Sequence, residues 1–246
     1  MEIARIKKTA VIGAGIMGSQ IAEIFSRVGG YEVAIVDIDK KLVEKGLQTI
    51  KERLERFFVS KGKMTNEQKE AILGRISGGV SIAELVREAD FVVEAVPEDL
   101  ALKKRVFSEL DNCAPKHAIL ASNTSSLNIT EIGSSTSRPE KVIGMHFFNP
   151  VAVMKLVEVV KGVHTSKETV ELTCAFARKL GKEPVICTDT SFGFLANRAY
   201  NAMVNEAVQM LWERVASPED IDKALKLGYN LPIGPLELMD LSLIHI

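Results

Sequence analysis

A glycine-rich turn between a strand pattern and a helix pattern constrains the fold of this chain most strongly. Residues 9–12 form a short apolar strand pattern, and Gly13, Gly15 and Gly18 follow with the spacing G-x-G-x-x-G before a helical pattern. The first glycine permits a tight turn, the second lets the backbone approach a pyrophosphate, and the third allows close helix packing. A second strand pattern at 33–37 follows, which indicates the βαβ start of a parallel sheet.

Asp37 ends the second predicted strand, 19 residues after Gly18. A carboxylate at this place accepts hydrogen bonds from a ribose diol and repels a 2′-phosphate. Strand, glycine turn and acid together predict NAD rather than NADP as the cofactor, with Gly13, Gly15, Gly18 and Asp37 as its contacts. A glycine turn without a ligand and a surface aspartate are the alternative interpretation.

The order of apolar runs predicts two domains of different class. Short strand patterns alternate with helical patterns as far as Asp189, and two helical patterns without a further strand then cover 193–214 and 218–227. We therefore predict an α/β fold, with a mostly parallel Rossmann-type sheet in residues 1–189 and a smaller all-helical domain in residues 190–246.

Composition limits the partners of the chain. Lysine and arginine number 31 against 32 acidic residues, so the formal net charge of -1 gives no general attraction to nucleic acid or an anionic membrane. The three cysteines have no metal-ligand spacing, no apolar run reaches the ~20 residues needed to span a bilayer, and no signal region precedes the first strand. We expect a cytoplasmic protein without a metal, nucleic-acid or membrane partner.

A histidine and a glutamate fall on two neighbouring strand patterns. His146 ends a strand at the carboxyl edge of the predicted sheet, where open α/β folds bind ligands. Glu158 lies inside the apolar run 156–160, and a buried carboxylate is costly unless it is paired. Glu158 beside His146 would hold the tautomer and stabilise the imidazolium of a general base, but a structural ion pair explains the same pattern.

Two further polar groups have both a structural and a functional interpretation. The segment 122–126 is dense in Ser, Thr and Asn, which suits a turn and a helix cap or a polar floor for a substrate hydroxyl. Asn197, near the start of the long helical pattern, could point into a cleft or bond across its own helix.

Six motifs in a fixed order add a resemblance that covers about residues 8 to 240. GAGIMG, EAVPEDL, SNTSSL, HFFNPV, MKLVEVV and GFLANR together resemble the 3-hydroxyacyl-CoA dehydrogenase family, including the 3-hydroxybutyryl-CoA dehydrogenases. The resemblance implies an NAD-dependent oxidoreductase that transfers hydride from the C3 hydroxyl of an L-3-hydroxyacyl-CoA. It also implies that His146 is the general base and that Glu158 is its partner.

The same resemblance implies roles for four more residues and an assembly. Ser125 and Asn197 fall on substrate-contacting positions, and Glu98 and Lys103 fall on positions that contact the cofactor. The family's helical domain forms a dimer interface and continues well past residue 240, whereas this chain stops at the apolar residues 241–246. We therefore expect a homodimer through a helical domain that is truncated.

Two other functions stay open at this point. A dehydrogenase of a small hydroxy acid could use the same fold, NAD and the same pair of residues. A truncated NAD-binding protein with poor turnover is the other possibility. Basic side chains on the predicted helix after Asp37 could bind the CoA phosphates, although a solvated helix face explains the same charges equally well. These residues are Lys45, Lys51, Arg53 and Arg56.

Overall fold

The chain divides into two compact units. A computed structural model describes residues 3–243, with one unit up to Phe192 and a second from Gly193. The sequence patterns place the domain boundary between residues 189 and 190, three residues earlier. The predicted truncation concerned the apolar residues 241–246, and 244–246 lie outside the described residues.

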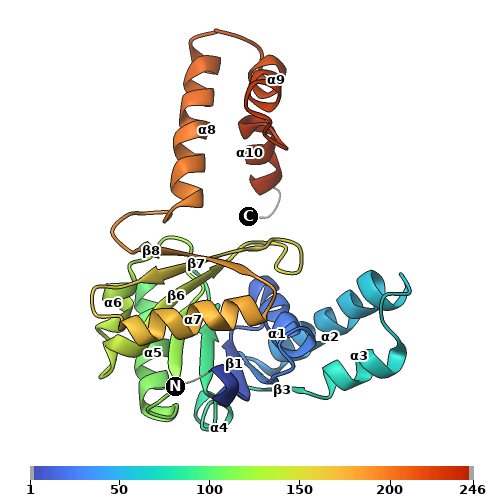
Figure 1. Ribbon diagram of the computed structural model, residues 1–246, viewed down its shortest axis with the longest axis vertical. Helices are drawn as coiled ribbons and strands as arrows, with labels where there is room; N and C mark the ends of the chain where they lie inside the picture. The colour runs from blue at the N-terminus through green and yellow to red at the C-terminus, as the bar shows by residue number, and fades with distance from the viewer. Residues whose placement is uncertain (1–2, 244–246) are drawn as a thin grey trace. The chain divides into compact units, whose positions relative to one another are not determined.

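One sheet organises the first unit, and Figure 1 shows helices packed around it. Eight strands within residues 3–192 follow the order β3-β2-β1-β4-β5-β6-β7-β8, and β6 and β7 form the one antiparallel pair among them. The predicted mostly parallel Rossmann-type sheet is therefore confirmed. The strands are β1 (Lys8–Ile12), β2 (Glu32–Val36), β3 (Ile76–Gly79), β4 (Phe91–Glu94), β5 (Ile119–Ser122), β6 (Val142–Phe147), β7 (Leu156–Lys161) and β8 (Glu183–Thr188).

Helices connect the strands and bury the apolar side chains of the sheet. Phe176 of the last of these helices stacks on Phe91 of β4, with ring centroids 4.3 Å apart, and meets Phe25 of the first helix edge-on at 5.0 Å. These two helices therefore share one part of the core. The α-helices are α1 (Ile16–Arg27), α2 (Lys40–Leu54), α3 (Asn66–Leu73), α4 (Ile82–Leu85), α5 (Leu100–Cys113), α6 (Ile129–Gly133) and α7 (Lys167–Lys179). The short 3-10 helices η1 (Ile3–Arg5) and η3 (Pro139–Lys141) and the π-helix η2 (Glu55–Val59) complete the unit.

Some elements differ from the sequence-based expectation for identifiable reasons. β3 has the sequence Ile-Ser-Gly-Gly, which lacks an apolar alternation, and it exists because it pairs with β2 at the sheet edge. The helix predicted after Asp37 ends as α2 at Leu54 and continues as the π-helix η2. α6 is only five residues long, which is too short for a helical period to show in the sequence.

The second unit is helical, as predicted, and contains α8 (Ala196–Trp212), α9 (Pro218–Tyr229) and α10 (Pro235–Leu243). The carboxylate of Asp222 in α9 accepts the backbone N–H groups of Leu236 and Glu237 at 2.9 and 2.8 Å. The hydroxyl of Tyr200 in α8 donates to the carbonyl of Pro235 at 3.2 Å. The start of α10, which the sequence patterns did not predict, is thus held from both other helices.

Candidate active site

The glycine turn has the geometry of a phosphate cradle. Gly13 has a φ of +101°, and a Cβ at this residue would lie 2.6 Å from the carbonyl oxygen of Ala95. A Cβ at Gly18 would lie 1.8 Å from the carbonyl oxygen of Gly13, so the helix and the turn are in close contact. Gly15 faces open space and begins α1 without a side-chain cap from the described residues. The free backbone N–H groups at the N-terminus of α1 are therefore suited to bind an anionic group such as a pyrophosphate.

Asp37 lies beside this cradle. It follows β2, and its Oδ2 accepts the backbone N–H of Ala14 at 2.7 Å while Oδ1 accepts the N–H of Ile38 at 2.7 Å. The side chain is half-buried, so part of the carboxylate remains accessible to a ligand. This arrangement fits a nucleotide whose pyrophosphate meets α1 and whose ribose hydroxyls meet Asp37.

His146 and Glu158 are in direct contact at the carboxyl end of β6. The two residues lie opposite each other in the antiparallel pair of β6 and β7, with 2.8 Å between Nδ1 of His146 and Oε2 of Glu158. Both are buried, with exposed fractions of 4% and 0%. The ring of Phe148 lies 4.5 Å from the imidazole ring, measured between centroids. The contact that the sequence could not establish therefore exists, and it fixes the orientation of the imidazole.

The segment after β5 forms a polar loop next to this pair. Oδ1 of Asn123 accepts the backbone N–H of Phe147 at 2.9 Å, which ties the loop to the residue after His146. The hydroxyl of Thr124 accepts the N–H groups of Ser126 and Leu127 at 3.2 and 2.9 Å. Part of the segment thus serves turn formation, as the structural interpretation predicted.

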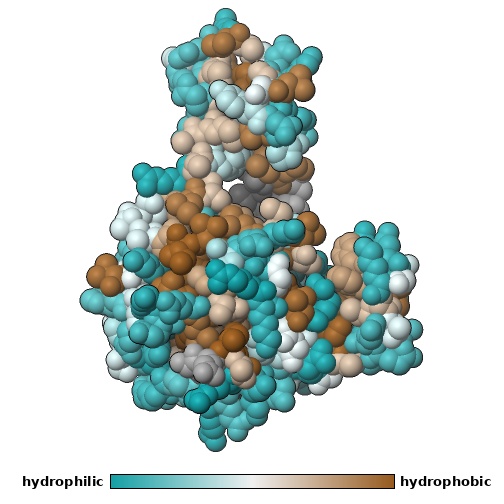
Figure 2. Space-filling view, viewed as in Figure 1, coloured by the Kyte–Doolittle hydropathy of each residue, from teal (hydrophilic) through white to brown (hydrophobic). Residues whose placement is uncertain are grey.

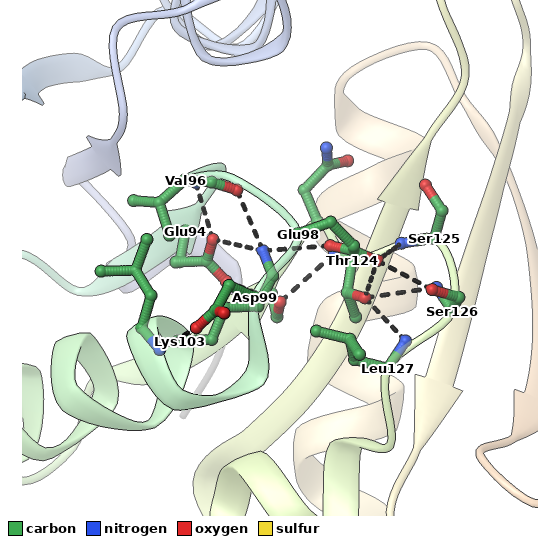
Figure 3. Close-up of polar contacts among 12 residues, drawn as sticks. Glu94, Val96, Glu98, Asp99, Lys103, Thr124, Ser125, Ser126 and Leu127 are labelled. Carbon is green, nitrogen blue, oxygen red and sulfur yellow. Dashed lines mark hydrogen bonds and ion pairs between the residues drawn. The ribbon is translucent and has the colours of Figure 1, made fainter. Parts of the chain in front are cut away.

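Glu98 holds the same loop from the neighbouring β4–α5 connection (Figure 3). Its Oε1 accepts the hydroxyl of Thr124, the backbone N–H of Ser125 at 2.9 Å and the hydroxyl of Ser126 at 3.1 Å. The Ser125 side chain points away from Glu98 in Figure 3. Burial acts to raise the pKa of Glu98, but these hydrogen bonds and the charge of Lys103 outweigh it, so the pKa is lowered.

Lys103 lies beneath this loop and is buried, with 1% of its side chain exposed. Its Nζ contacts Oε1 of Glu94 at 2.7 Å, the carbonyl of Val96 at 3.2 Å and Oε2 of Glu98 at 3.4 Å. Glu94, 0% exposed, also accepts the N–H of Val96 and the hydroxyl of Ser122, each at 2.7 Å. Burial raises the pKa of Glu94, while Lys103 and the hydrogen bonds oppose that shift. Of the two carboxylates that Lys103 contacts, Glu98 is therefore the exposed one, with 40% of its side chain accessible.

All predicted site residues except Asn197 lie in the first unit. The first unit contains the cradle with Asp37, the His146–Glu158 pair and the Ser125 loop with Glu98 and Lys103. Asn197 lies in the first turn of α8 in the second unit, so its substrate contact stays a prediction. Residues 3–243 contain no helix long and apolar enough to cross a membrane. Within the same range, His, Cys, Asp and Glu form no group suited to a metal ion.

Comparisons with known families cover both units. Residues 8–190 match the family described as 3-hydroxyacyl-CoA dehydrogenase, NAD binding domain, and residues 193–246 match the corresponding C-terminal domain. The chain belongs to the 3-hydroxyacyl-CoA dehydrogenase family. The family resemblance seen in the motifs is thereby confirmed, as is NAD as the cofactor of an oxidoreductase.

Individual members of the family are similar over almost the whole chain. A probable 3-hydroxybutyryl-CoA dehydrogenase of Bacillus subtilis is 47% identical over 235 residues, which cover 96% of this chain and 80% of the relative. The mitochondrial hydroxyacyl-coenzyme A dehydrogenase of Rattus norvegicus is 43% identical, with 96% and 76% covered. The crystal structure of (S)-3-hydroxybutyryl-CoA dehydrogenase from Ralstonia eutropha has a TM-score of 0.92 and 43% identity, and the match covers 96% of this chain and 82% of that one.

Proposed function

We propose that this dehydrogenase oxidises the C3 hydroxyl of an L-3-hydroxyacyl-CoA with NAD, and that His146 is the general base. The observation that carries the proposal is the 2.8 Å contact between Nδ1 of His146 and Oε2 of Glu158 at the carboxyl edge of the sheet. With Nδ1 facing Glu158, the opposite ring nitrogen, Nε2, is the one that receives the proton. The three relatives described above carry hydroxybutyryl-CoA or hydroxyacyl-CoA dehydrogenase names, which supports a thioester substrate.

The residues of the site divide the work of the reaction. NAD, when bound, supplies the hydride acceptor at C4 of the nicotinamide. His146 removes the proton of the C3 hydroxyl, and the buried carboxylate of Glu158 stabilises the positive imidazole that results. Ser125 holds the oxygen atom as it changes from a hydroxyl to a carbonyl, and a contact of Asn197 with the substrate stays a prediction. A positioned base of this kind contributes ~10²–10⁴-fold to the rate.

The cofactor contacts follow from the cradle and from the loop. Gly13, Gly15 and Gly18 with the start of α1 receive the pyrophosphate, and Asp37 receives the ribose. Glu98, which holds the Ser125 loop, is the proposed second contact to the cofactor, because 40% of its side chain is exposed and can meet a ligand. Lys103 contributes through Glu98, whose Oε2 lies 3.4 Å from its Nζ, since its own side chain is buried.

A hollow between α1 and α2 is a candidate place for an anionic CoA group. It has a volume of about 320 Å³, and Arg53 and Arg56 line it together with the acidic Glu52 and the amide of Gln20. Arg53 is already paired with Glu23, 2.8 Å from Nε to Oε2, so Arg56 is the better phosphate candidate of the two. Lys45 and Lys51 are exposed on α2 and would add only a diffuse positive field.

The helical unit supports the proposal of a homodimer. Hydrophobic residues reach its surface (Figure 2), and Trp212, Leu227 and Tyr229 are 77%, 77% and 76% exposed. Contact with a second copy would remove this apolar surface from water. The cytoplasmic location predicted from composition stays a prediction.

A substrate comparison tests the proposed function. NADH consumption is followed at saturating cofactor with acetoacetyl-CoA and, separately, with free acetoacetate. We expect turnover that requires the thioester. Faster turnover of the free acid would favour the dehydrogenase of a small hydroxy acid. Tight NADH binding without turnover of either compound would favour the poorly active NAD-binding protein.

A further inference from the structure

Gln20 connects the cofactor cradle to the segment that follows His146. It lies in the second turn of α1, two residues after Gly18, and only 5% of it is exposed. Its partners belong to the connection between β6 and β7, more than 120 residues away in the sequence. Neither the glycine fingerprint nor the His146–Glu158 pair accounts for a buried amide at this place.

The amide of Gln20 uses its donor and its acceptor on that distant segment. Nε2 donates to Oδ1 of Asn149 at 3.0 Å and lies 3.3 Å from the carbonyl of Ile16, while Oε1 accepts the backbone N–H of Val151 at 2.9 Å. Asn149 is an exposed residue, whereas the bond to Val151 is buried. A buried amide is costly unless it is hydrogen-bonded, and Gln20 meets this need with two partners in one short loop.

The loop that Gln20 holds joins the two strands of the candidate catalytic pair. Residues 148–155 connect β6, which carries His146, to β7, which carries Glu158. Lys182 also holds this loop, because its Nζ donates to the carbonyls of Val151 and Met154. Burial and the charge of Arg27 lower the pKa of Lys182.

We propose that Gln20 is a positioning residue that sets the distance between the bound cofactor and His146. The inference rests on the proposed function. The N–H groups in the first turn of α1 suit the pyrophosphate of the cofactor. Because Gln20 of the same helix bonds to Asn149 and Val151, it fixes the position of the cradle relative to the loop after His146. Hydride transfer requires the reacting atoms to be held close, and a displacement of about 1 Å can cost ~10²-fold in rate.

Gln20→Met tests this role because methionine has a similar length and no amide. We expect kcat with acetoacetyl-CoA and NADH to fall ~10- to 100-fold. The KM for NADH should change less than kcat, because the cradle itself is intact. The primary isotope effect on kcat with NADH deuterated at the transferred position should rise, since hydride transfer then limits turnover. A structural role alone would lower the melting temperature and leave the isotope effect unchanged.

Asn149→Ala removes one of the two loop contacts of Gln20 at an exposed residue and leaves the bond to Val151 in place. If Gln20 acts through this loop, the double variant should be at most ~2-fold slower than the slower single variant, because the two changes remove one interaction. Gln48→Met is the matched control: Gln48 is an exposed glutamine of α2 whose amide donates to Glu52 of the same helix, and its loss should change none of these readouts.

Each outcome decides between the alternatives. Wild-type kcat and isotope effect in Gln20→Met, or fully multiplicative losses in the double variant, would overturn the role of Gln20. If Gln20→Met does not fold, Asn149→Ala tests the bond between Gln20 and Asn149, and wild-type kinetics in that variant would overturn a role for this bond, because the bond to Val151 remains. An unmodified protein that does not turn over acetoacetyl-CoA would instead contradict the proposed function.

Discussion

Glu158 lies directly opposite His146 in the antiparallel register of β6 and β7, so their 2.8 Å contact is a property of the strand pairing. A shift of the register by one residue would move the Glu158 side chain to the other face of the sheet. The flanking residues Val157 and Val159 are fully buried, and their burial opposes such a shift. The geometry of the pair is therefore maintained by the core as well as by its own hydrogen bond.

The first prediction concerns this pair. His146→Ala should lower kcat by ~10²–10⁴-fold, because the proton acceptor is lost. Glu158→Gln should lower kcat by a smaller factor, because the amide oxygen can still accept the N–H of Nδ1 but no longer carries a charge. Stopped-flow measurement of single-turnover rates checks both. Glu171→Gln on the exposed side of α7 is the control, and wild-type rates in Glu158→Gln would contradict the partnership.

Cofactor choice gives the second prediction. The unmodified protein should prefer NAD to NADP, and Asp37→Ala should weaken NAD binding while it relaxes the rejection of the 2′-phosphate. Dissociation constants from calorimetry with both cofactors measure the change. Asp39→Asn is the matched control, since Asp39 caps α2 and asparagine preserves a cap. Equal affinity of the unmodified protein for NAD and NADP would contradict the role of Asp37.

Local sequence signals were enough to predict the part of the fold that binds the cofactor. The glycine turn needs residues that are adjacent in the chain, and Asp37 follows at a fixed offset, so strand, turn, helix and acid could all be predicted. His146 and Glu158 were visible as candidates because each breaks an apolar strand pattern. Their contact was not predictable from the residues alone, because it depends on the register of two strands joined by a loop.

Glu94 shows what the sequence analysis missed. It is an acid at the end of the apolar run Phe91–Glu94, which is the same signal that identified Glu158. Its partner Lys103 is nine residues away in α5, and nothing in the sequence shows that this lysine points inward rather than to solvent. The contacts of Gln20 were equally hidden, because they join residues 129 and 131 positions apart.

The buried ion pair gives the third prediction. Lys103→Met should lower the free energy of unfolding by about 3–5 kcal/mol, because it leaves the carboxylate of Glu94 buried without its partner. Lys167→Met provides the comparison at the surface: Lys167 forms an exposed pair with Glu171 that is worth about 0.3–0.5 kcal/mol. Urea unfolding at neutral pH measures both. Similar small losses in the two variants would show that the buried pair is not required.

The lowered pKa of Glu98 gives a fourth prediction, on pH. A carboxyl group whose pKa is lower in the folded state stabilises the fold above its unfolded value of 4.5, and this contribution is lost as the pH falls through the folded pKa. Protection of the Ser125 amide against hydrogen exchange should therefore decrease as the pH falls below 4.5. In Glu98→Gln this dependence should disappear, whereas a pH-independent protection factor in the unmodified protein would contradict the prediction.

The last prediction concerns assembly through the helical unit. Trp212 and Leu227 are each 77% exposed, and burial of apolar surface contributes about 25 cal/mol per Å², so covering both would favour association. We expect light scattering across a dilution series to give the mass of a dimer, and Trp212→Glu with Leu227→Glu to shift it towards a monomer. Val163→Glu, at a 76% exposed residue of the first unit, should leave the dimer intact. A monomer at micromolar concentration would contradict the prediction, and so would a spread of larger masses, because a specific dimer has a closed two-fold interface.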